Sequence, residues 1–186
     1  MKPNSNMKKR VITLCSIAFL CILIIAFGLS VFQSKHISKF SKSDEKASIA
    51  YNYLENPTDL SSAQIIGIIS NIKSQSNFDT TIHQTTPNLV GLMCWSYARA
   101  SKLEDCATQN GKDIDNFYVQ LDYIIEEISE DSENFQLVNH NDYTIEDWNS
   151  VKNPVDAALI FESLYVRPGI SSQNLEDIAI NYAESL

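Results

Sequence analysis

The sequence has few of the residues that build metal or nucleotide sites. Its three histidines, His36, His83 and His140, stand isolated in polar surroundings. Neither Cys94 nor Cys106 has a partner at the short spacing of a zinc site. The chain also contains no nucleotide- or flavin-binding motif, no internal repeat and no low-complexity tract. We therefore expect no metal and no cofactor.

Basic residues are scarce outside the N-terminus. The chain has 14 Lys and Arg against 23 Asp and Glu, and residues 1–32 hold four of the basic residues and none of the acidic ones. The remainder therefore carries ten basic and 23 acidic residues, a formal charge of −13. Nucleic acids and anionic lipid headgroups bind basic surfaces, so this balance argues against both as partners of that part. Residues 44–186 are enough for one domain with its own core.

Cysteine is also infrequent, with four residues in the chain. Cys15 and Cys21 belong to the N-terminal apolar stretch, whereas Cys94 and Cys106 lie in the later part, where a disulfide persists if that part is exported. If the residues between them are helical, twelve positions separate the two thiols by more than the ~5.5 Å Cα spacing of a bridge. The sequence leaves this pairing open.

One long hydrophobic run stands near the N-terminus. Lys8, Lys9 and Arg10 precede residues 11–32, a stretch without charge that is long enough to cross a bilayer. It exceeds the usual core of a cleaved signal peptide, so it favours a signal anchor, although residues 26–28 loosely imitate a cleavage site. Positive charge before the span places the N-terminus in the cytoplasm and the following residues outside.

These features predict a single-pass protein of the cell membrane with four parts. They are a cytoplasmic basic tail (1–10), a transmembrane anchor (11–32), a stalk (33–43) and an extracytoplasmic domain (44–186). If the N-terminal segment is cleaved, the domain is secreted instead.

Residues 61–76 form the clearest helix of that domain. Ser61 and Gln64 have the spacing of a capping box, and isoleucines then recur at three- and four-residue steps along one face. Gly67 keeps the adjoining face small, so a neighbouring helix can approach closely. Gln75 lies on the isoleucine face at its far end, where a polar side chain emerges at the rim of a core. By itself, this pattern is also typical of a helix that ends in a solvated glutamine.

The rest of the domain is expected to be mostly helical. Apolar spacing and end signals predict helices over 44–54, 98–109, about 114–128, a short one after Thr144, one opening at Asn153-Pro154 and a last one around 175–182. Residues 78–95 have no helical period and predict a loop with short strands. In the third of these helices, Ile114, Tyr118 and Ile128 belong to one stripe that we expect in the core. The acidic run over 126–133 is interpreted as a solvated face without chemistry.

Four segments carry a resemblance to a known family. Residues 67–78 follow the G-I-x-x-N-I-x-x-E-S-x-F part of the pattern A-x-G-I-x-x-N-I-x-x-E-S-x-F-x-P, and residues 91–99 follow G-L-x-Q-W-x-x-x-R. Residues 120–124 fit Q-L-D-Y-L, and residues 157–168 fit A-A-x-x-F-x-x-x-Y-E-R-P. In this order and spacing they resemble the phage tail lysozyme family of peptidoglycan hydrolases. Two departures stand out, because Gln75 replaces the glutamate of the first pattern and Cys94 the glutamine of the second.

The resemblance implies a fold and a site. The fold would be mainly α, a lysozyme-like α+β domain with a small β region beside a cleft, preceded here by the transmembrane helix. Gln75 would occupy the position of the family's catalytic acid. Residues that would bind the substrate are Ser76, Asp79, Cys94, Trp95 and Arg99. Without the resemblance, Trp95 is interpreted as a core residue and Arg99 as a surface ion-pair partner.

Three hypotheses about function remain open. In the first, the membrane-anchored domain binds peptidoglycan glycan strands, or an envelope protein, and is catalytically impaired by Gln75. In the second, it is an active hydrolase whose acid lies elsewhere, or a variant whose natural glutamate was replaced by Gln75. In the third, it is a structural part of an envelope export or conjugation apparatus.

Overall fold

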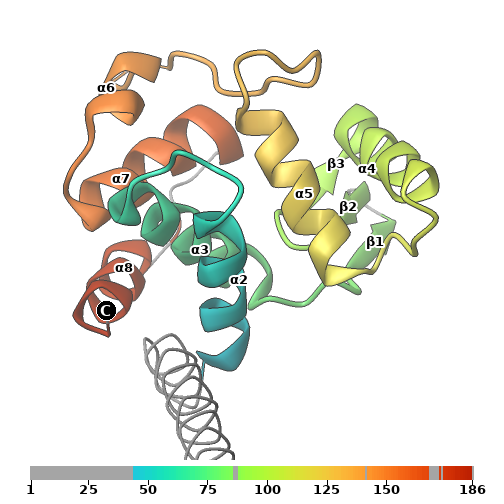
Figure 1. Cartoon of the computed structure of the whole chain (residues 1–186), viewed down its shortest axis with the longest axis horizontal. Coiled ribbons are helices and arrows are strands. Elements are labelled where there is room, and N and C mark those ends of the chain that lie inside the picture. The colour runs from blue at the N-terminus through green and yellow to red at the C-terminus, as the bar shows by residue number, and fades with distance from the viewer. Residues whose placement is uncertain (1–43, 86–87, 141, 168–171, 173, 186) are drawn as a thin grey trace, which may run out of the picture. The chain divides into compact units, whose positions relative to one another are not determined.

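The computed structural model of this chain describes residues 44–85, 88–140, 142–167, 172 and 174–185 (Figure 1). The predicted cytoplasmic tail, transmembrane anchor and stalk lie outside the described residues. No helix within the described ranges is both long and apolar enough to cross a membrane.

Helices and one small sheet make up the domain. The elements follow one another as α2 (Glu45–Glu55), α3 (Ser62–Ser76), β1 (His83–Thr85), β2 (Asn88–Val90), β3 (Trp95–Ser96), α4 (Tyr97–Gln109), α5 (Phe117–Ile128), α6 (Ile145–Ser150), α7 (Pro154–Phe161), the π-helix η2 (Glu162–Val166) and α8 (Leu175–Glu184). This arrangement confirms the expected mainly helical α+β domain with a small β region. Figure 1 shows α3 among α2, α7 and α8, whereas α4 and the strands lie beyond α5.

Helix α3 is the centre of the helical core. It begins with the predicted capping box, in which Ser61 accepts from the Gln64 N–H and the Gln64 side chain accepts from the Ser61 N–H. Its isoleucines at 65, 66, 68, 69 and 72 are all buried. Helices α2, α7 and α8 pack around it, so almost every face of α3 is covered. This burial stabilises a helix whose sequence is apolar on more than one side.

The close approach of α3 and α7 depends on Gly67. A Cβ at this position would lie 2.8 Å from the backbone carbonyl carbon and oxygen of Ala157. One turn further along α3, the Asn71 amide donates to the backbone carbonyl of Ala158 at 3.0 Å. The prediction that Gly67 admits a neighbouring helix is therefore confirmed.

The three strands form an antiparallel sheet in the order β1-β2-β3. A turn at Gly91, where φ is +65°, leads the chain from β2 toward β3. The buried Gln120 of α5 holds this turn, because its Oε1 accepts the Leu92 N–H at 2.8 Å and its Nε2 donates to the carbonyls of Thr80 and Ile114. The amide of Gln120 therefore joins α5 to the β region.

Helix α5 differs from its prediction in two respects. It begins later than the expected start near residue 114, because Asn116 accepts the first free N–H groups, those of Tyr118 and Val119. Tyr118 is 48 % exposed and not in the core, whereas Val119 and Tyr123 are buried. The physical reason is that α5 contacts both α2 and α4, so that its buried surface is wider than one stripe.

Helices α6 and α7 begin at the capping residues that the sequence predicts. Thr144 and Asp147 form a capping box at α6, and Asn153 caps α7 with Pro154 in the first turn. After Phe161 the chain continues as the π-helix η2, which ends at Arg167 with φ +53°. The wider turn carries Glu162, Leu164 and Tyr165 into the interior.

Candidate functional site

The C-terminal end of α3 presents Gln75 at the rim of the core. The helix stops sharply there, because Asn77 and Phe78 both have positive φ values, 53° and 59°. Ser76 is buried and donates to the carbonyl of Ile72, so it faces its own helix. Gln75 is half-buried, and its Nε2 donates to the Oγ of Ser172 at 3.2 Å.

A buried carboxylate stands behind this contact. The Oε1 of Glu162, a side chain only 4 % exposed, accepts the backbone N–H of Ser172 at 2.6 Å. Ser172 therefore links Gln75 of α3 with Glu162 of η2. π-Helical turns are frequent at functional sites, and here the turn begins at this carboxylate.

Cys94 connects the β region to the same helix end. Its Sγ donates to the backbone carbonyl of Gln75 at 3.4 Å, one of the carbonyls that the end of a helix leaves unpaired. The backbone of Cys94 has φ +50°, and its N–H closes a turn with the carbonyl of Gly91. Burial raises the pKa of the Cys94 thiol, which keeps it protonated as a donor. The replacement of the family's glutamine thus lies directly beside Gln75.

Asp79 lies in solvent near the end of α3. Its carboxylate accepts from the hydroxyl and the backbone N–H of Thr81 at 2.7 and 2.9 Å. These hydrogen bonds lower the pKa of Asp79, first through the Thr81 hydroxyl and then through its N–H. Asp79 is therefore ionised at neutral pH and has no proton to give.

Trp95 and Arg99 both bind the buried carboxylate of Glu127. Trp95 is 1 % exposed, and its indole N–H donates to a carboxylate oxygen of Glu127 at 2.8 Å. Arg99 donates through Nε and Nη2 to the two oxygens of Glu127, and its guanidinium lies 4.4 Å from the ring centre of Tyr165. In this structure the Trp95 indole covers and binds a buried charge, in agreement with its interpretation as a core residue, and its role in substrate binding stays a prediction.

The same cluster corrects the interpretation of the acidic run. Glu130, Asp131 and Glu133 are exposed as expected, but Glu127 is completely buried. Its carboxylate also accepts from the hydroxyl of Tyr165 at 2.5 Å. Burial, together with the charge of Glu127, raises the pKa of Tyr165 well above its usual value, so the hydroxyl remains a donor.

The sequence could not place three residues of these two clusters. Ser172 carries no signal in the sequence. Glu162 is a possible replacement acid on sequence grounds, but only the structure shows that it is joined to Gln75 through Ser172. Glu127 could not be told apart from the neighbouring acids by composition. Its place three residues after Ile124 puts it on the same helix face as that buried residue, and this spacing could have indicated its burial. Tyr165 belongs to the pattern over residues 157–168, which by itself assigns it no role.

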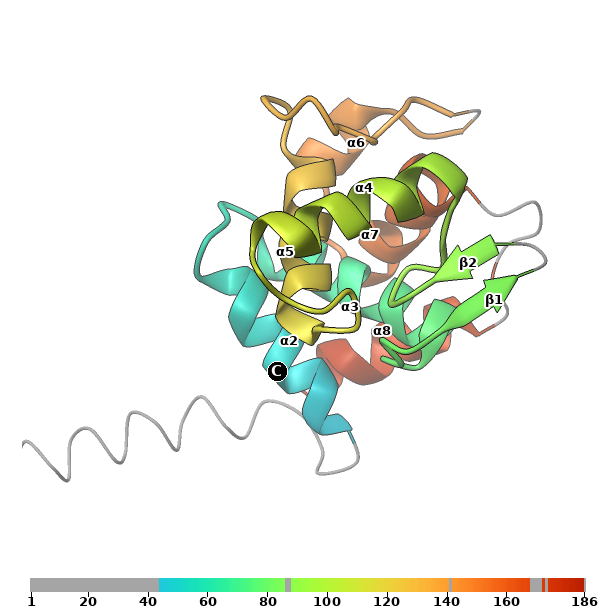
Figure 2. The ribbon, with the colours of Figure 1, turned by 90° about the vertical axis from the view of Figure 1, so that its right-hand side faces the viewer.

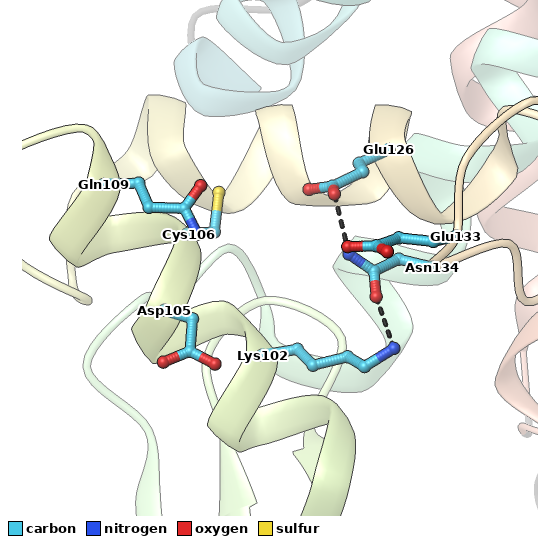
Figure 3. Close-up of a pocket in the computed structure, with 7 residues that line it drawn as sticks. All are labelled: Lys102, Asp105, Cys106, Gln109, Glu126, Glu133 and Asn134. Atoms are coloured by element: carbon cyan, nitrogen blue, oxygen red, sulfur yellow. Dashed lines mark hydrogen bonds between the residues drawn. The ribbon is translucent and has the colours of Figure 1, made fainter.

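A separate pocket of about 310 Å³ lies between α4 and α5 (Figure 3). The Asn134 amide donates to Glu126 at 2.7 Å, and the Lys102 ammonium donates to Asn134, so that the central polar groups of the pocket bind one another.

Cys106 lines this pocket, and both Cys94 and Cys106 are free thiols. The open question of a disulfide is thereby answered for this structure. No group of three or more metal-ligating side chains occurs among the residues that the structure describes.

The Gln75 cluster offers hydrogen bonds but limited acid chemistry. An amide can donate through Nε2 and accept through Oε1, yet it carries no proton that can be released at accessible pH. Nε2 directs one of its two N–H groups to Ser172, and an amide bonded in this way can still donate through its second N–H and accept through Oε1. These groups suit the hydroxyl or N–H groups of a polar ligand.

Comparison with known proteins agrees with this architecture. The family model for phage tail lysozyme matches residues 45–186, which is most of the chain and includes every element from α2 to α8. No curated protein matches the chain. This match covers the Gln75 helix, the sheet and the buried Trp95–Glu127 cluster together. The chain therefore belongs to the phage tail lysozyme family, whose lysozyme-like domains imply a role on peptidoglycan.

Proposed function

We propose that this protein holds peptidoglycan glycan strands at the C-terminal end of α3 and cleaves them slowly or not at all. The single observation that carries the proposal is the half-buried amide of Gln75 at the end of α3, with its Nε2 bonded to Ser172. The resemblance implies that this is the position of the family's catalytic acid. The family match over residues 45–186 supports peptidoglycan as the polymer.

Cleavage between two sugars requires a proton for the leaving oxygen. In lysozyme-type enzymes a carboxylic acid in a partly apolar setting keeps this proton near neutral pH. Position 75 provides that setting, since it is half-buried at the end of the isoleucine face of α3. Gln75 has the shape of the acid without its proton, so the site retains hydrogen bonding and loses general acid catalysis, which is typically worth 10²–10⁴-fold.

Neither of the two carboxylates that the structure places near Gln75 takes over this role. Asp79 is ionised because Thr81 lowers its pKa. Glu162 is 4 % exposed and accepts the Ser172 N–H, so its carboxyl group is not open to a bound sugar. This pair of observations favours impaired catalysis over the hypothesis of a displaced acid.

Attachment to the membrane is part of the proposal. The uncharged stretch over residues 11–32, with Lys8, Lys9 and Arg10 before it, supports a single span with the domain on the outer side. An anchored domain without cutting activity would hold the wall close to the membrane. A purely structural role in an envelope apparatus is the alternative in which glycan binding is absent.

The test is the clearing of purified cell-wall material by the full-length chain and by Gln75→Glu. We expect the natural chain to release almost no sugar ends and Gln75→Glu to release them at least 100-fold faster. Gln75→Met, which has a similar volume and no acid, is the matched control and should remain inert. Efficient clearing by the natural chain would overturn the proposal. A Gln75→Glu variant that folds and binds the wall without cutting would show that more than one side chain was lost.

A further inference from the structure

Binding of sugar chains usually needs an exposed aromatic face. A pyranose ring presents C–H groups on its faces and hydroxyl groups at its edge, which matches an aromatic ring with a polar tip. The two tryptophans of the chain cannot serve, because Trp95 and Trp148 are 1 % and 2 % exposed. If Gln75 is the centre of a glycan site, its aromatic surface must come from elsewhere.

Tyr97 has the exposure that such a surface requires. It is the first residue of α4 and is 72 % exposed, more than any other large hydrophobic side chain of the described residues. Tyr118 is next among the aromatic residues at 48 %, but its ring lies 5.2 Å from that of Tyr53 and 5.9 Å from that of Phe117. No comparable ring contact of Tyr97 occurs in the described part of the chain.

The backbone of Tyr97 gives a second, independent indication. Its φ is +46°, a left-handed conformation that costs free energy for every residue except glycine. The side chain does not repay this cost by burial, since it is mostly in solvent. Strained non-glycine residues gather at functional sites, where the surrounding structure holds them in place.

Tyr97 also lies close in the chain to the residue that touches the end of α3. It follows β3 directly and is three residues beyond Cys94, whose Sγ touches the carbonyl of Gln75. Three residues span at most about 10 Å between Cα atoms. Figure 2 shows α4 running from the sheet, and α4 contacts both β2 and β3. A sugar chain that lies over the end of α3 and extends along the β region therefore reaches the start of α4.

We propose that Tyr97 is a stacking surface for one sugar ring of a glycan whose neighbouring unit is bound at Gln75. The inference rests on the proposed function and deepens it by naming where the strand continues. Ring stacking supplies apolar contact, and the Tyr97 hydroxyl can bond to the edge of the sugar. The pairing of β3 with β2 holds the backbone that leads into Tyr97.

The first experiment measures binding of the full-length chain to purified peptidoglycan and to a soluble N-acetylglucosamine oligomer. We expect Tyr97→Ala to weaken binding to both about tenfold, whereas Tyr97→Phe and Tyr97→Trp keep most of it. The matched control is Tyr118→Ala, which removes a half-exposed tyrosine on α5 and should leave the affinity unchanged. Equal binding by the natural chain and Tyr97→Ala overturns the inference.

A second variant separates binding from folding. Glycine prefers the backbone conformation of Tyr97, so Tyr97→Gly should keep or raise Tm while it weakens binding as much as Tyr97→Ala does. A fall in Tm with unchanged affinity would show that Tyr97 serves the fold and not the glycan. If the natural chain binds neither probe, the proposed function fails and this inference fails with it. If the natural chain binds and the Tyr97 variants bind equally well, the proposed function stands and this inference fails.

Discussion

Arg99 and Glu127 form a two-point ion pair in the interior of the domain, with N···O distances of 2.8 and 2.9 Å. The Glu127 side chain is fully buried and that of Arg99 is 20 % exposed. Trp95 and Tyr165 donate to the same carboxylate, so two family patterns (residues 91–99 and 157–168) and the acidic run converge on one charge. This cluster holds β3, α4, α5 and η2 together, which gives Trp95 and Arg99 a structural role.

Removal of Arg99 should destabilise the domain strongly. Arg99→Met leaves Glu127 charged, buried and without its cation, a situation that typically costs about 3–5 kcal/mol. The double variant Arg99→Met/Glu127→Gln should cost less than the sum of the two single changes, because the uncompensated charge is gone. Urea unfolding measures these differences. Lys73→Met, which breaks the more exposed Lys73–Asp44 pair, is the control and should cost about 1 kcal/mol or less.

A methyl group at position 67 should push α7 away from α3. Gly67→Ala places a Cβ 2.8 Å from the backbone of Ala157, which cannot move aside as a side chain can. We expect a loss of about 1–3 kcal/mol in the free energy of unfolding, despite the higher helix propensity of alanine. Ser74→Ala on the half-buried part of the same helix should be nearly neutral in the same measurement. Equal stability of the two variants would contradict the tight packing of α3 on α7.

Stability should fall at alkaline pH, in part through Tyr53. Burial and the hydrogen bond to Asp122, 2.6 Å long, raise the pKa of Tyr53 to about 12. The folded state therefore holds this proton more tightly than the unfolded chain, whose tyrosines titrate near 10. The resulting contribution is complete below about pH 10 and is lost as pH rises through 12. Tm measured between about pH 9 and pH 12 should fall less steeply for Tyr53→Phe than for the natural chain, and parallel curves would refute the assignment.

The Gln75→Glu variant should have a pH profile that depends on Glu162. The introduced carboxyl would be half-buried and joined through Ser172 to a second carboxylate, and both conditions raise its pKa. Cleavage should therefore continue toward neutral pH and decline as pH rises above that pKa. With Glu162→Gln added, the decline should begin at lower pH, because a neutral neighbour no longer disfavours ionisation. Asp79→Asn is the control, and superimposable profiles for all three would contradict the link through Ser172.

Cys94 and Cys106 should remain unpaired even under oxidising conditions. The thiol of Cys94 points to the carbonyl of Gln75, whereas Cys106 lines the pocket between α4 and α5. Burial raises the pKa of both thiols, so we expect slow alkylation at neutral pH that becomes faster as pH increases. Mass spectrometry of the air-oxidised, alkylated protein measures the outcome. A peptide that joins Cys94 to Cys106 would contradict it.

Much of the local structure could be predicted because its causes are local. The capping boxes at Ser61 and Thr144, the cap at Asn153 and the small residue Gly67 all act within one or two helical turns or through one close contact. The start of α5 could not, because Asn116 and Asp115 are equally good caps and only packing against α2 and α4 selects one of them.

The sequence by itself determined the family, the helical core around α3 and the amide at position 75, since these depend on the spacing and chemistry of residues that are close together in the chain. Only the tertiary structure decided which polar and aromatic side chains are buried, which are exposed and which contact one another. It buried Glu127 and Trp95, exposed Tyr97 and brought Ser172 and Glu162 to Gln75. The physical reason is that burial and long-range hydrogen bonds depend on which elements meet, and residues some 90 positions apart carry no local signal of their meeting.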